Sequence, residues 1–453
     1  MIKFFRRLFW LTSSFVKKYY QLILTSFVIS LVVGFIGSKI VGKLPSQTSA
    51  VRLGLVGQYT SQSLPPLIKN ILNSGLTKVG PNQTIVENLA GWEVADEGKR
   101  YIFTLKPSLN WSDGSPVKAA DIVISIPDVN IQFEGNDKII FTLPQAFAPF
   151  PSVLTNPITN KAGLTASVYQ VNLTQNTNGV LSKIQLKSAD QTIVVRPFPS
   201  TAQALTAYKL GEVDAIYNYP KVSDFDLSPY GVVRETKNYH QALAIFMNNQ
   251  DPTLKDKSIR QGIAYALKDK GFSHDRALGP ISAASWAYNP LVKLYEFDSQ
   301  KAVDLIRNSL PDKNQVVNLE LAAIPAYLPV AEKIKSQLDP NLINLNIKVV
   351  TSRPDSYQLY LTLFDIGNDP DQYVFWHSTA VANNISKVSN ERLDKDLEDG
   401  RRTLDQNERK KIYTDFQRTF AEELPTLFLF YPTYSNLARR EAIFAIIKPE
   451  LAL

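Results

Sequence analysis

The most chemically suggestive stretch of the chain brings three aspartates close together. It reads "DIGNDPDQ" (365–372) and contains Asp365, Asp369 and Asp371. Closely spaced carboxylates are typical of calcium loops, but the spacing does not follow the EF-hand pattern. The twelfth position is Trp376, where that pattern needs a glutamate. The three carboxylates are therefore either polar groups of a ligand pocket or caps of turns.

Patterns that would indicate an enzyme are weak or missing from the sequence. His240, His274 and His377 are far apart and none is paired at helical spacing, so we expect structural histidines and no metal site. Ser14-Phe-Val-Lys17 matches the Ser-x-x-Lys pattern of acyl-transfer enzymes, but we attribute this match to chance. The sequence contains no Gly-x-Ser-x-Gly, P-loop or Gly-x-Gly-x-x-Gly motif. We therefore expect a protein that is not an enzyme, with no catalytic residues and no cofactor.

Aromatic side chains near these polar groups are candidates for the walls of a pocket. "DIGNDPDQYVFWHST" adds Trp376 and His377 to the aspartates, and "SWAYNP" contributes Trp286 and Tyr288. Pockets for amphipathic ligands combine apolar walls with a few fixed polar groups. The alternative is that Trp286 and Trp376 fill the core. The residues that we predict to bind a ligand are Tyr59, Phe246, Asn248, Trp286, Tyr288, Asp365, Asp369, Trp376 and His377.

Composition describes a globular chain whose positive charge is local. The chain has 453 residues, 44% of them hydrophobic and 20% charged, which is enough for one large core or two to three domains. Its net charge is +7, but residues 1–50 hold seven of the 49 basic residues and none of the 42 acidic ones, so 42 of each sign remain. The neutral body gives no reason to expect binding of nucleic acid.

The N-terminal residues have the pattern of a membrane anchor. Residues 19–38 carry no charge and are about long enough to cross a bilayer. Five positive residues precede this segment, so we expect 1–18 to be a cytoplasmic arm and 39–50 to be a linker. "TSA" (48–50) is too distant to be a convincing signal-peptidase site, which favours an uncleaved signal anchor. The body should then lie outside the cytoplasm, and a chain without cysteine has neither disulfides nor a lipid-modified cysteine.

Local patterns predict alternating strands and helices. In "GWEVADEGKRYIFTLKPSLNWSDGSPVKAADIV" (91–123), two strands flank the turn at Asp96-Glu97-Gly98, Trp92 and Trp111 pack in a core, and a helix begins at Pro116. Residues 171–180 read as a polar loop. Alternation of strands and helices favours an α/β architecture. Further strands are predicted at 51–57, 138–144, 192–199 and 241–248, and helices at 200–211, 256–267, 298–309 and 405–424.

The phrase "LAGWEVADEGKRYIFTLKPSLNWSDGSPVKAADIV" resembles the signature region of bacterial extracellular solute-binding proteins of family 5. These are the peptide/nickel type that serve ABC importers. Later phrases match the family in order, among them "STAQALTAYKLGEVDAIYNYP", "FMNNQDPTLKDKSIRQGIAYAL" and "DPDQYVFWHS". The resemblance implies a periplasmic-binding-protein-like type II fold, with two lobes around a ligand cleft and an accessory subdomain that is trimmed here.

The resemblance also implies domain limits and an anchor for the ligand. We expect lobe I to comprise 51–88, 185–238 and 425–453, lobe II to comprise 239–424, and the accessory subdomain to comprise 89–184. In peptide-binding members, an aspartate shortly before the Asp-Pro pair holds the ligand's amine. Direct alignment places Ile366 there, with Asp365 one residue away. One residue on a strand reverses the direction of a side chain, so the two positions face opposite ways.

These observations lead to two expectations about function. The first is a membrane-anchored receptor, monomeric, that closes its lobes around an oligopeptide or similar small solute and delivers it to ABC transporter permease subunits. The alternative is a tethered extracellular sensor or scaffold that keeps the binding-protein fold without import. A neighbouring gene for a permease would distinguish them.

Overall fold

The structure is a computed structural model that describes residues 18–21, 25–26, 49–60, 65–220 and 226–447. The chain divides into two compact units, Met1–Ala50 and Val51–Leu453. Most of the segment 19–38 lies outside the described residues. Within the described ranges, no helix is both long and apolar enough to cross a membrane.

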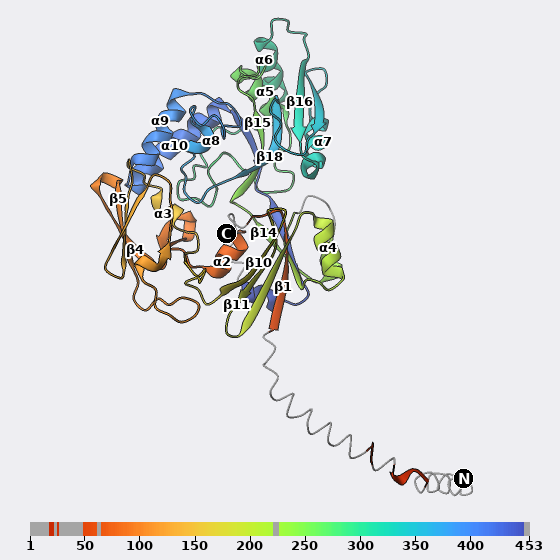
Figure 1. Ribbon diagram of the computed structural model, residues 1–453. Coiled ribbons are helices and arrows are strands. Elements are labelled where there is room, and N and C mark those ends of the chain that lie inside the picture. Colours follow the sequence, from red (N-terminus) through yellow and green to blue (C-terminus); the bar gives the residue numbers. More distant parts are fainter. Residues whose placement is uncertain (1–17, 22–24, 27–48, 61–64, 221–225, 448–453) are drawn as a thin grey trace, which may run out of the picture. The chain divides into compact units, whose positions relative to one another are not determined.

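The first large sheet of the second unit has seven strands and forms the centre of lobe I (Figure 1). β1 pairs with β13 in parallel, and the pairs β10–β11, β11–β12, β13–β20 and β14–β20 are antiparallel. Buried side chains of β1, β11 and β12 pack against helix α2 (Pro66–Leu72) in one core. In spatial order the strands are β10 (Gln170–Thr177), β11 (Val180–Lys187), β12 (Gln191–Phe198), β1 (Ser49–Val56), β13 (Ala215–Pro220), β20 (Thr433–Ala438) and β14 (Val232–Lys237).

One interpretation of lobe I from sequence is wrong. Residues 171–180 are not a polar loop, because β10 and β11 form a hairpin there. Asn178 and Gly179 have φ values of 52° and 78°, the left-handed pair that a tight hairpin turn needs. The Asn-Gly pair was the available signal, and the polar composition of the exposed strand concealed it.

The second large sheet has five strands and forms the centre of lobe II. Alternate residues of its strand β15 enter two different cores, as the period of two requires. Leu243 and Ile245 pack against helices α5, α6 and α7, whereas Ala244 and Phe246 pack against α8, α9 and α10. The strands in order are β17 (Ile343–Val349), β16 (Val317–Ala323), β18 (Leu359–Asp365), β15 (Gln241–Met247) and β19 (Thr426–Phe430). The helices are α5 (Lys257–Ala266), α6 (Ser299–Ser309), α7 (Leu328–Gln337), α8 (Tyr373–Trp376), α9 (Glu391–Arg402) and α10 (Gln406–Glu423).

Helix starts follow the sequence closely. Ser200 caps helix α4 (Thr201–Lys209) by accepting a hydrogen bond from the Gln203 backbone N–H, and Gly211 follows with a φ of 78°. Asp298 caps α6, and Asp405 caps α10 by accepting from the Glu408 N–H at 2.9 Å. Each of these side chains satisfies a backbone N–H group of the first turn, which has no partner within the helix.

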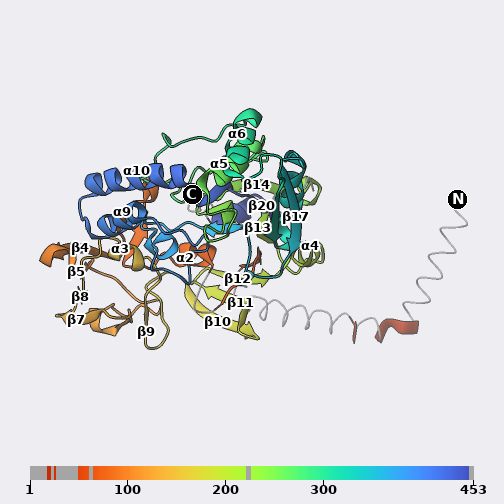
Figure 2. The same ribbon diagram turned by 90° about the horizontal axis from the view of Figure 1, so that it is seen from above.

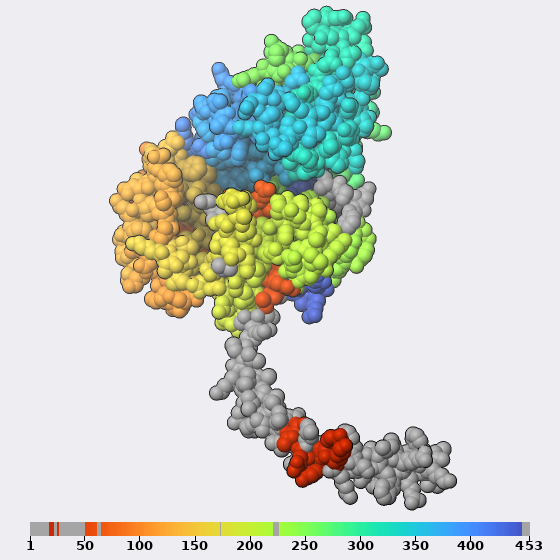
Figure 3. All heavy atoms as spheres, turned by 45° about the vertical axis from the view of Figure 1, so that its right-hand side comes forward, coloured from red at the N-terminus to blue at the C-terminus, as the bar shows by residue number. Residues whose placement is uncertain are grey.

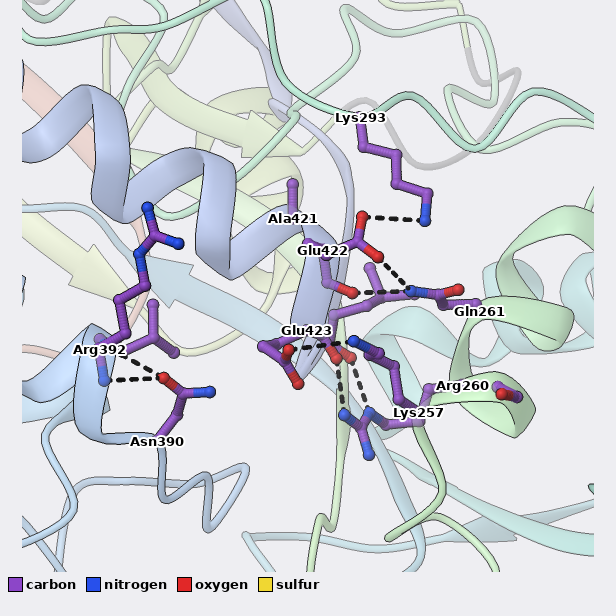
Figure 4. A network of polar contacts seen from close by, with 12 residues as sticks. Lys257, Arg260, Gln261, Lys293, Asn390, Arg392, Ala421, Glu422 and Glu423 are labelled. Atoms are coloured by element: carbon purple, nitrogen blue, oxygen red, sulfur yellow. Dashed lines mark hydrogen bonds and ion pairs between the residues drawn. The ribbon is translucent and has the colours of Figure 1, made fainter.

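The carboxyl end of α10 is held by side chains of α5 (Figure 4). Arg260 is only 4% exposed, and Gln261 beside it donates from Nε2 to the Glu422 carbonyl at 2.7 Å. The last carbonyls of a helix have no partner within it, so these side chains satisfy groups that burial would otherwise leave unpaired. Arg260 donates, at 2.6–3.2 Å, to the carbonyl oxygens of Leu254, Lys255, Glu423 and Leu424.

A smaller four-stranded sheet forms a hairpin subdomain (90–166) with its own core. Its strands in order are β4 (Ala90–Ala95), β5 (Arg100–Leu105), β8 (Lys138–Thr142) and β7 (Asn130–Glu134), and helix α3 (Phe150–Val153) packs beside them. The predicted hairpin is confirmed, with Trp92 opposite Phe103 and Trp111 buried. Figures 1 and 2 show this subdomain beside α9 and α10.

The helix predicted after Pro116 is wrong. The structure has a 3-10 turn at Ala119–Asp121 and then strand β6 (Ile122–Val123), which pairs with β9 (Thr159–Asn160). Burial alternates along "DIVISI", with Ile122 buried and Val123 exposed. That period of two indicates a strand, although the alanines before it favour a helix.

The chain passes between the two large sheets twice within the described residues. It leaves lobe I after β14 through residues 238–240 and returns after β19 through residues 431–432. The Asn238 N–H donates to the Pro432 carbonyl at 2.9 Å, so the two crossing segments are joined. Strand β10 and part of strand β11 fall in the range 89–184, which the resemblance assigns to the accessory subdomain, and they lie in the sheet of lobe I. Strand β19 falls in the range 425–453, which the resemblance assigns to lobe I, and it lies in the sheet of lobe II.

Candidate functional site

The carboxylate of Asp365 lies at the end of lobe II that meets lobe I. Asp365 is the last residue of β18 and stands opposite Gln241, the first residue of β15. Its Oδ1 accepts a hydrogen bond from Gln241 Nε2 at 2.7 Å. Gln241 Oε1 in turn accepts from the Tyr434 hydroxyl of lobe I, also at 2.7 Å. Gln241 therefore connects an exposed carboxylate of lobe II to a strand of lobe I.

Three tyrosines lie close enough to this carboxylate for its charge to act on their pKa values. Burial raises the pKa of Tyr59, and the negative charge of Asp365 contributes to the rise. Burial and then Asp365 raise the pKa of Tyr327 in the same way, and the pKa of Tyr434 is also raised by burial, with contributions from neighbouring phenols and Asp365. Neutral phenols thus flank one exposed negative charge. This arrangement suits a positively charged group, because phenol oxygens accept hydrogen bonds and phenol rings attract cations.

The backbone decides which of the two aligned positions faces this site. Phe364 and Ile366 are both buried in the core beneath α8–α10, next to Trp376. Side chains alternate along a strand, so Asp365 points away from that core. The position that the family's amine anchor would occupy holds a buried isoleucine here, and the carboxylate is displaced to the other face of β18.

The two later aspartates of the stretch have structural partners. Asp369 pairs with Arg409 at 2.7 Å, and the two side chains are 11% and 7% exposed. Asp371 pairs with Arg401 at 2.8 Å. Both pairs join the loop after β18 to α9 and α10. Because its carboxylate is already neutralised and largely buried, we do not include Asp369 in the site proposed below.

Several other residues from the predicted set lie inside lobe II. Trp376 is 1% exposed and stacks on Phe246, with ring centroids 5.9 Å apart. His377 is 4% exposed, and its ring nitrogens contact Thr379 and Glu398. These side chains fill the core or satisfy each other, which matches the alternative interpretation of Trp376.

Asn248 lies just beyond β15, at the end opposite to Gln241. Its Nδ2 donates to the Tyr357 carbonyl at 3.0 Å. At about 3.4 Å per residue, it is roughly 24 Å along the strand from Gln241, so it does not join Asp365. The sequence placed Phe246 and Asn248 together with Asp365 because the direction of β15 relative to the cleft was unknown.

Trp286 and Tyr288 are half-buried where a turn of the chain meets lobe II. The turn joins β2 (Thr77–Val79) to β3 (Ile85–Glu87), and its Asn82 carbonyl accepts from the Trp286 N–H at 2.8 Å. Gln83, the next residue of the turn, donates from Nε2 to the Ser282 hydroxyl at 3.3 Å. The same Nε2 lies 3.4 Å from Nδ1 of His240. Burial lowers the pKa of His240, which keeps the ring neutral near pH 7. These residues form a second meeting point of the two lobes.

The surface is hollowed between the lobes. Figure 3 shows a recess between the blue and cyan atoms of lobe II and the orange and yellow atoms below them. Of the predicted set, Tyr59 lies close enough to Asp365 for the carboxylate to act on its pKa. The sequence did not reveal Gln241, Tyr327 and Tyr434, because their positions depend on strand register and on contacts between distant segments. In the part of the chain that is described, no group of three or more metal-binding side chains is present.

Comparisons with known proteins agree with this architecture. The family model "Bacterial extracellular solute-binding proteins, family 5 Middle" matches residues 187–448. The probable D,D-dipeptide-binding periplasmic protein DdpA of Escherichia coli (strain K12) is 22% identical over 430 residues, covering 80% of this chain and 82% of that protein.

Solved structures share the fold. The ABC transporter substrate binding protein CtaP from Listeria monocytogenes has a TM-score of 0.71 and 19% identity, covering 86% of this chain and 94% of that chain. The oligopeptide-binding protein AppA from Bacillus subtilis, in complex with a nonapeptide, has a TM-score of 0.68 and 18% identity, covering 88% and 95%. The two-lobed α/β fold predicted from the sequence is confirmed. The family model matches more than half of this chain. The chain therefore belongs to the bacterial extracellular solute-binding proteins of family 5.

Proposed function

We propose that this chain is a membrane-anchored extracellular receptor that supplies an ABC importer with an amine-bearing solute, such as an oligopeptide. Family membership supports the role in uptake. The relatives named for dipeptides and the structural neighbour solved with a nonapeptide support a peptide-like solute. Residues 19–38 anchor the receptor, which acts as a monomer and delivers its solute to the permease subunits.

The observation that carries the choice of solute is the carboxylate of Asp365. It is exposed, lies at the lobe II end of the cleft, and receives one hydrogen bond, from Gln241, among the described residues. An ammonium group placed there gains an ion pair with the carboxylate and leaves the bond to Gln241 intact. Charge-assisted hydrogen bonds of this kind are about twice as strong as neutral ones.

The connections between the lobes support the proposal that the lobes close around the solute. Two short crossing segments permit a hinge motion, and the Gln241–Tyr434 bond lies beside them. A solute that contacts Asp365 on one lobe and Tyr59 on the other binds only when the lobes are close. Such a solute stabilises the closed form by mass action.

Mass spectrometry of the purified full-length chain tests the proposed solute. Solute released by denaturation should carry a primary or secondary amine, and its N-acetylated form should not bind when added back. Recovery of a neutral or anionic solute, bound as tightly as any amine, would overturn this assignment.

A reporter fused after residue 50 tests the anchor. Five positive residues before the apolar segment should keep the N-terminus inside, so a reporter that is active only outside the cytoplasm should be active. A cytoplasmic reporter signal would contradict both the anchor and extracellular capture. Release of a body lacking residues 1–50 would show a cleaved signal instead.

A further inference from the structure

The hairpin subdomain makes a direct contact with lobe II at the end of helix α9. The Ala148 N–H donates to the Arg401 carbonyl at 2.8 Å. The Arg401 guanidinium lies over the Phe147 ring, 5.1 Å from its centre. Nearby, the Leu404 side chain packs closely on Gly98. A Cβ atom added at position 98 would be only 3.0 Å from Leu404 Cδ2. These contacts join the loop after β8 and the β4–β5 turn to the end of α9 and to Leu404, which follows it.

Arg401 is held in place by lobe II alone. Its Nε and Nη2 donate to Asp371 Oδ2 at 3.1 and 2.8 Å. Its guanidinium also lies 4.1 Å from the centre of the Tyr373 ring. Asp371 and Tyr373 both belong to the segment that follows β18, so these contacts remain when the lobes separate.

Phe147 and Ala148 belong to the hairpin subdomain, whose chain continues into lobe I at both ends, through α2 and β10. The Thr77 hydroxyl donates to the Pro151 carbonyl at 2.7 Å, which joins the subdomain to the segment after α2. We therefore take the subdomain to move with lobe I, so that its contacts with Arg401 exist only when the lobes are together.

The contact lies away from the hinge. The crossing segments run through residues 238–240 and 431–432, between β14 and β15 and between β19 and β20. Figures 1 and 2 show α9 and α10 beside β4 and β5, to one side of β14 and β15. Burial raises the pKa of Tyr101 in β5 to about 12, and the Arg409–Asp369 pair of lobe II also acts on this phenol. The hairpin subdomain and lobe II are therefore close to each other at more than one residue. A hinge motion must separate a contact that lies far from its axis.

We infer that Phe147 and Ala148 form a latch with Arg401 that holds the lobes closed and slows release of the solute. This inference rests on the proposed function only in assuming that the lobes move. The latch contacts no group of the Asp365 site, so it changes the population of the closed form without changing the chemistry of recognition. Arg401 provides a cation fixed by Asp371, and the Phe147 ring is its partner on closure.

Distance measurements between two spin labels test the latch without knowledge of the solute. The chain has no cysteine, so Thr104→Cys in β5 and Lys395→Cys in α9 place labels only at two exposed positions. Phe147→Leu keeps apolar volume in the subdomain core but removes the ring. Phe147→Tyr keeps the ring, and Phe133→Leu is a matched control at a 43% exposed position of the same sheet.

The expected result is a closed-to-open ratio about two- to fivefold lower in Phe147→Leu than in the unsubstituted labelled chain, with Phe147→Tyr and Phe133→Leu unchanged. If circular dichroism shows that Phe147→Leu does not fold, Arg401→Gln, which removes the cation, carries the test and should lower the ratio similarly. A folded Phe147→Leu or Arg401→Gln chain with an unchanged ratio would overturn the latch alone. A single distance in every chain, unaffected by co-purified solute, would overturn lobe closure and the latch together.

Discussion

Asp365 and Asp369 belong to the same short stretch, yet the protein surrounds their carboxylates in opposite ways. Asp369 is 11% exposed and bound by the guanidinium of Arg409, itself 7% exposed. Asp365 is exposed and receives a hydrogen bond from the neutral amide of Gln241. A carboxylate that is buried and neutralised holds the fold together, whereas one that is exposed and only partly satisfied can bind a cation from outside.

Removing the charge of Asp369 should have the largest effect on stability. Asp369→Asn leaves the buried guanidinium of Arg409 without its counter-charge, which costs about 3–5 kcal/mol in buried pairs. Urea denaturation should show this loss, while Glu408→Gln, which breaks an exposed pair with Lys411, should change stability by less than about 0.5 kcal/mol. A loss below about 1 kcal/mol in Asp369→Asn would mean that the pair is structurally unimportant.

Arg260 offers a second test of a buried charged side chain whose groups are hydrogen-bonded within the protein. Arg260→Met removes the donor from two backbone carbonyls at the end of α10, those of Glu423 and Leu424, and each unpaired buried group costs about 1–3 kcal/mol. We expect a total loss of about 2–4 kcal/mol in thermal or chemical unfolding, since methionine recovers part of the packing. Solute affinity per folded molecule should not change. Wild-type stability, or a specific loss of affinity in the folded variant, would contradict this role.

Asp396 sharpens the comparison, because its buried Oδ2 has no hydrogen-bond partner among the described residues. Burial, together with the nearby Asp415 carboxylate, raises the pKa of Asp396 to about 6 from 3.8. The folded state thus binds this proton more tightly than the unfolded state. The protonated Asp396 side chain therefore stabilises the folded state. This contribution is fully present below about pH 3.8 and is lost as the pH rises through about 6.

Asp396→Asn should therefore be more stable than wild type at pH 7.5, by less than about 1 kcal/mol because the group is partly solvated. The difference should disappear near pH 4. Melting curves at both pH values measure it, with Asp355→Asn, an exposed aspartate of lobe II, as the control. A difference that is constant with pH would show that Asp396 titrates normally.

Sequence patterns were sufficient for features set by local chemistry. Asp405 caps α10 because its side chain reaches the N–H of Glu408, three residues later. The β4–β5 hairpin forms because glycine at Gly98 permits a left-handed turn between two alternating segments. Family phrases then predicted the two-lobed architecture. The helix expected after Pro116 was lost because the alternation of "DIVISI" prevailed over helix propensity.

The site depended on long-range geometry that one sequence does not contain. Gln241 meets Asp365 through strand register, and Tyr434, which is 193 residues from Gln241, arrives through the return crossing of the chain. Trp376 was a candidate for a pocket wall because it is a large aromatic residue. Large aromatic residues also fill cores, which is where the structure places Trp376. The aspartates could be separated into structural and exposed members only once Arg401 and Arg409 were placed beside two of them.

Calorimetric titration of Asp365→Asn tests the central claim most directly. The co-purified solute, identified by mass spectrometry, is titrated into the wild type, Asp365→Asn and the control Asp355→Asn after each chain has been stripped of solute. If Asp365 anchors an ammonium group, its replacement should weaken binding by about 2–5 kcal/mol, while the control binds like the wild type. Equal affinities for all three folded chains would contradict the claim and show that the carboxylate at the end of β18 does not hold the solute.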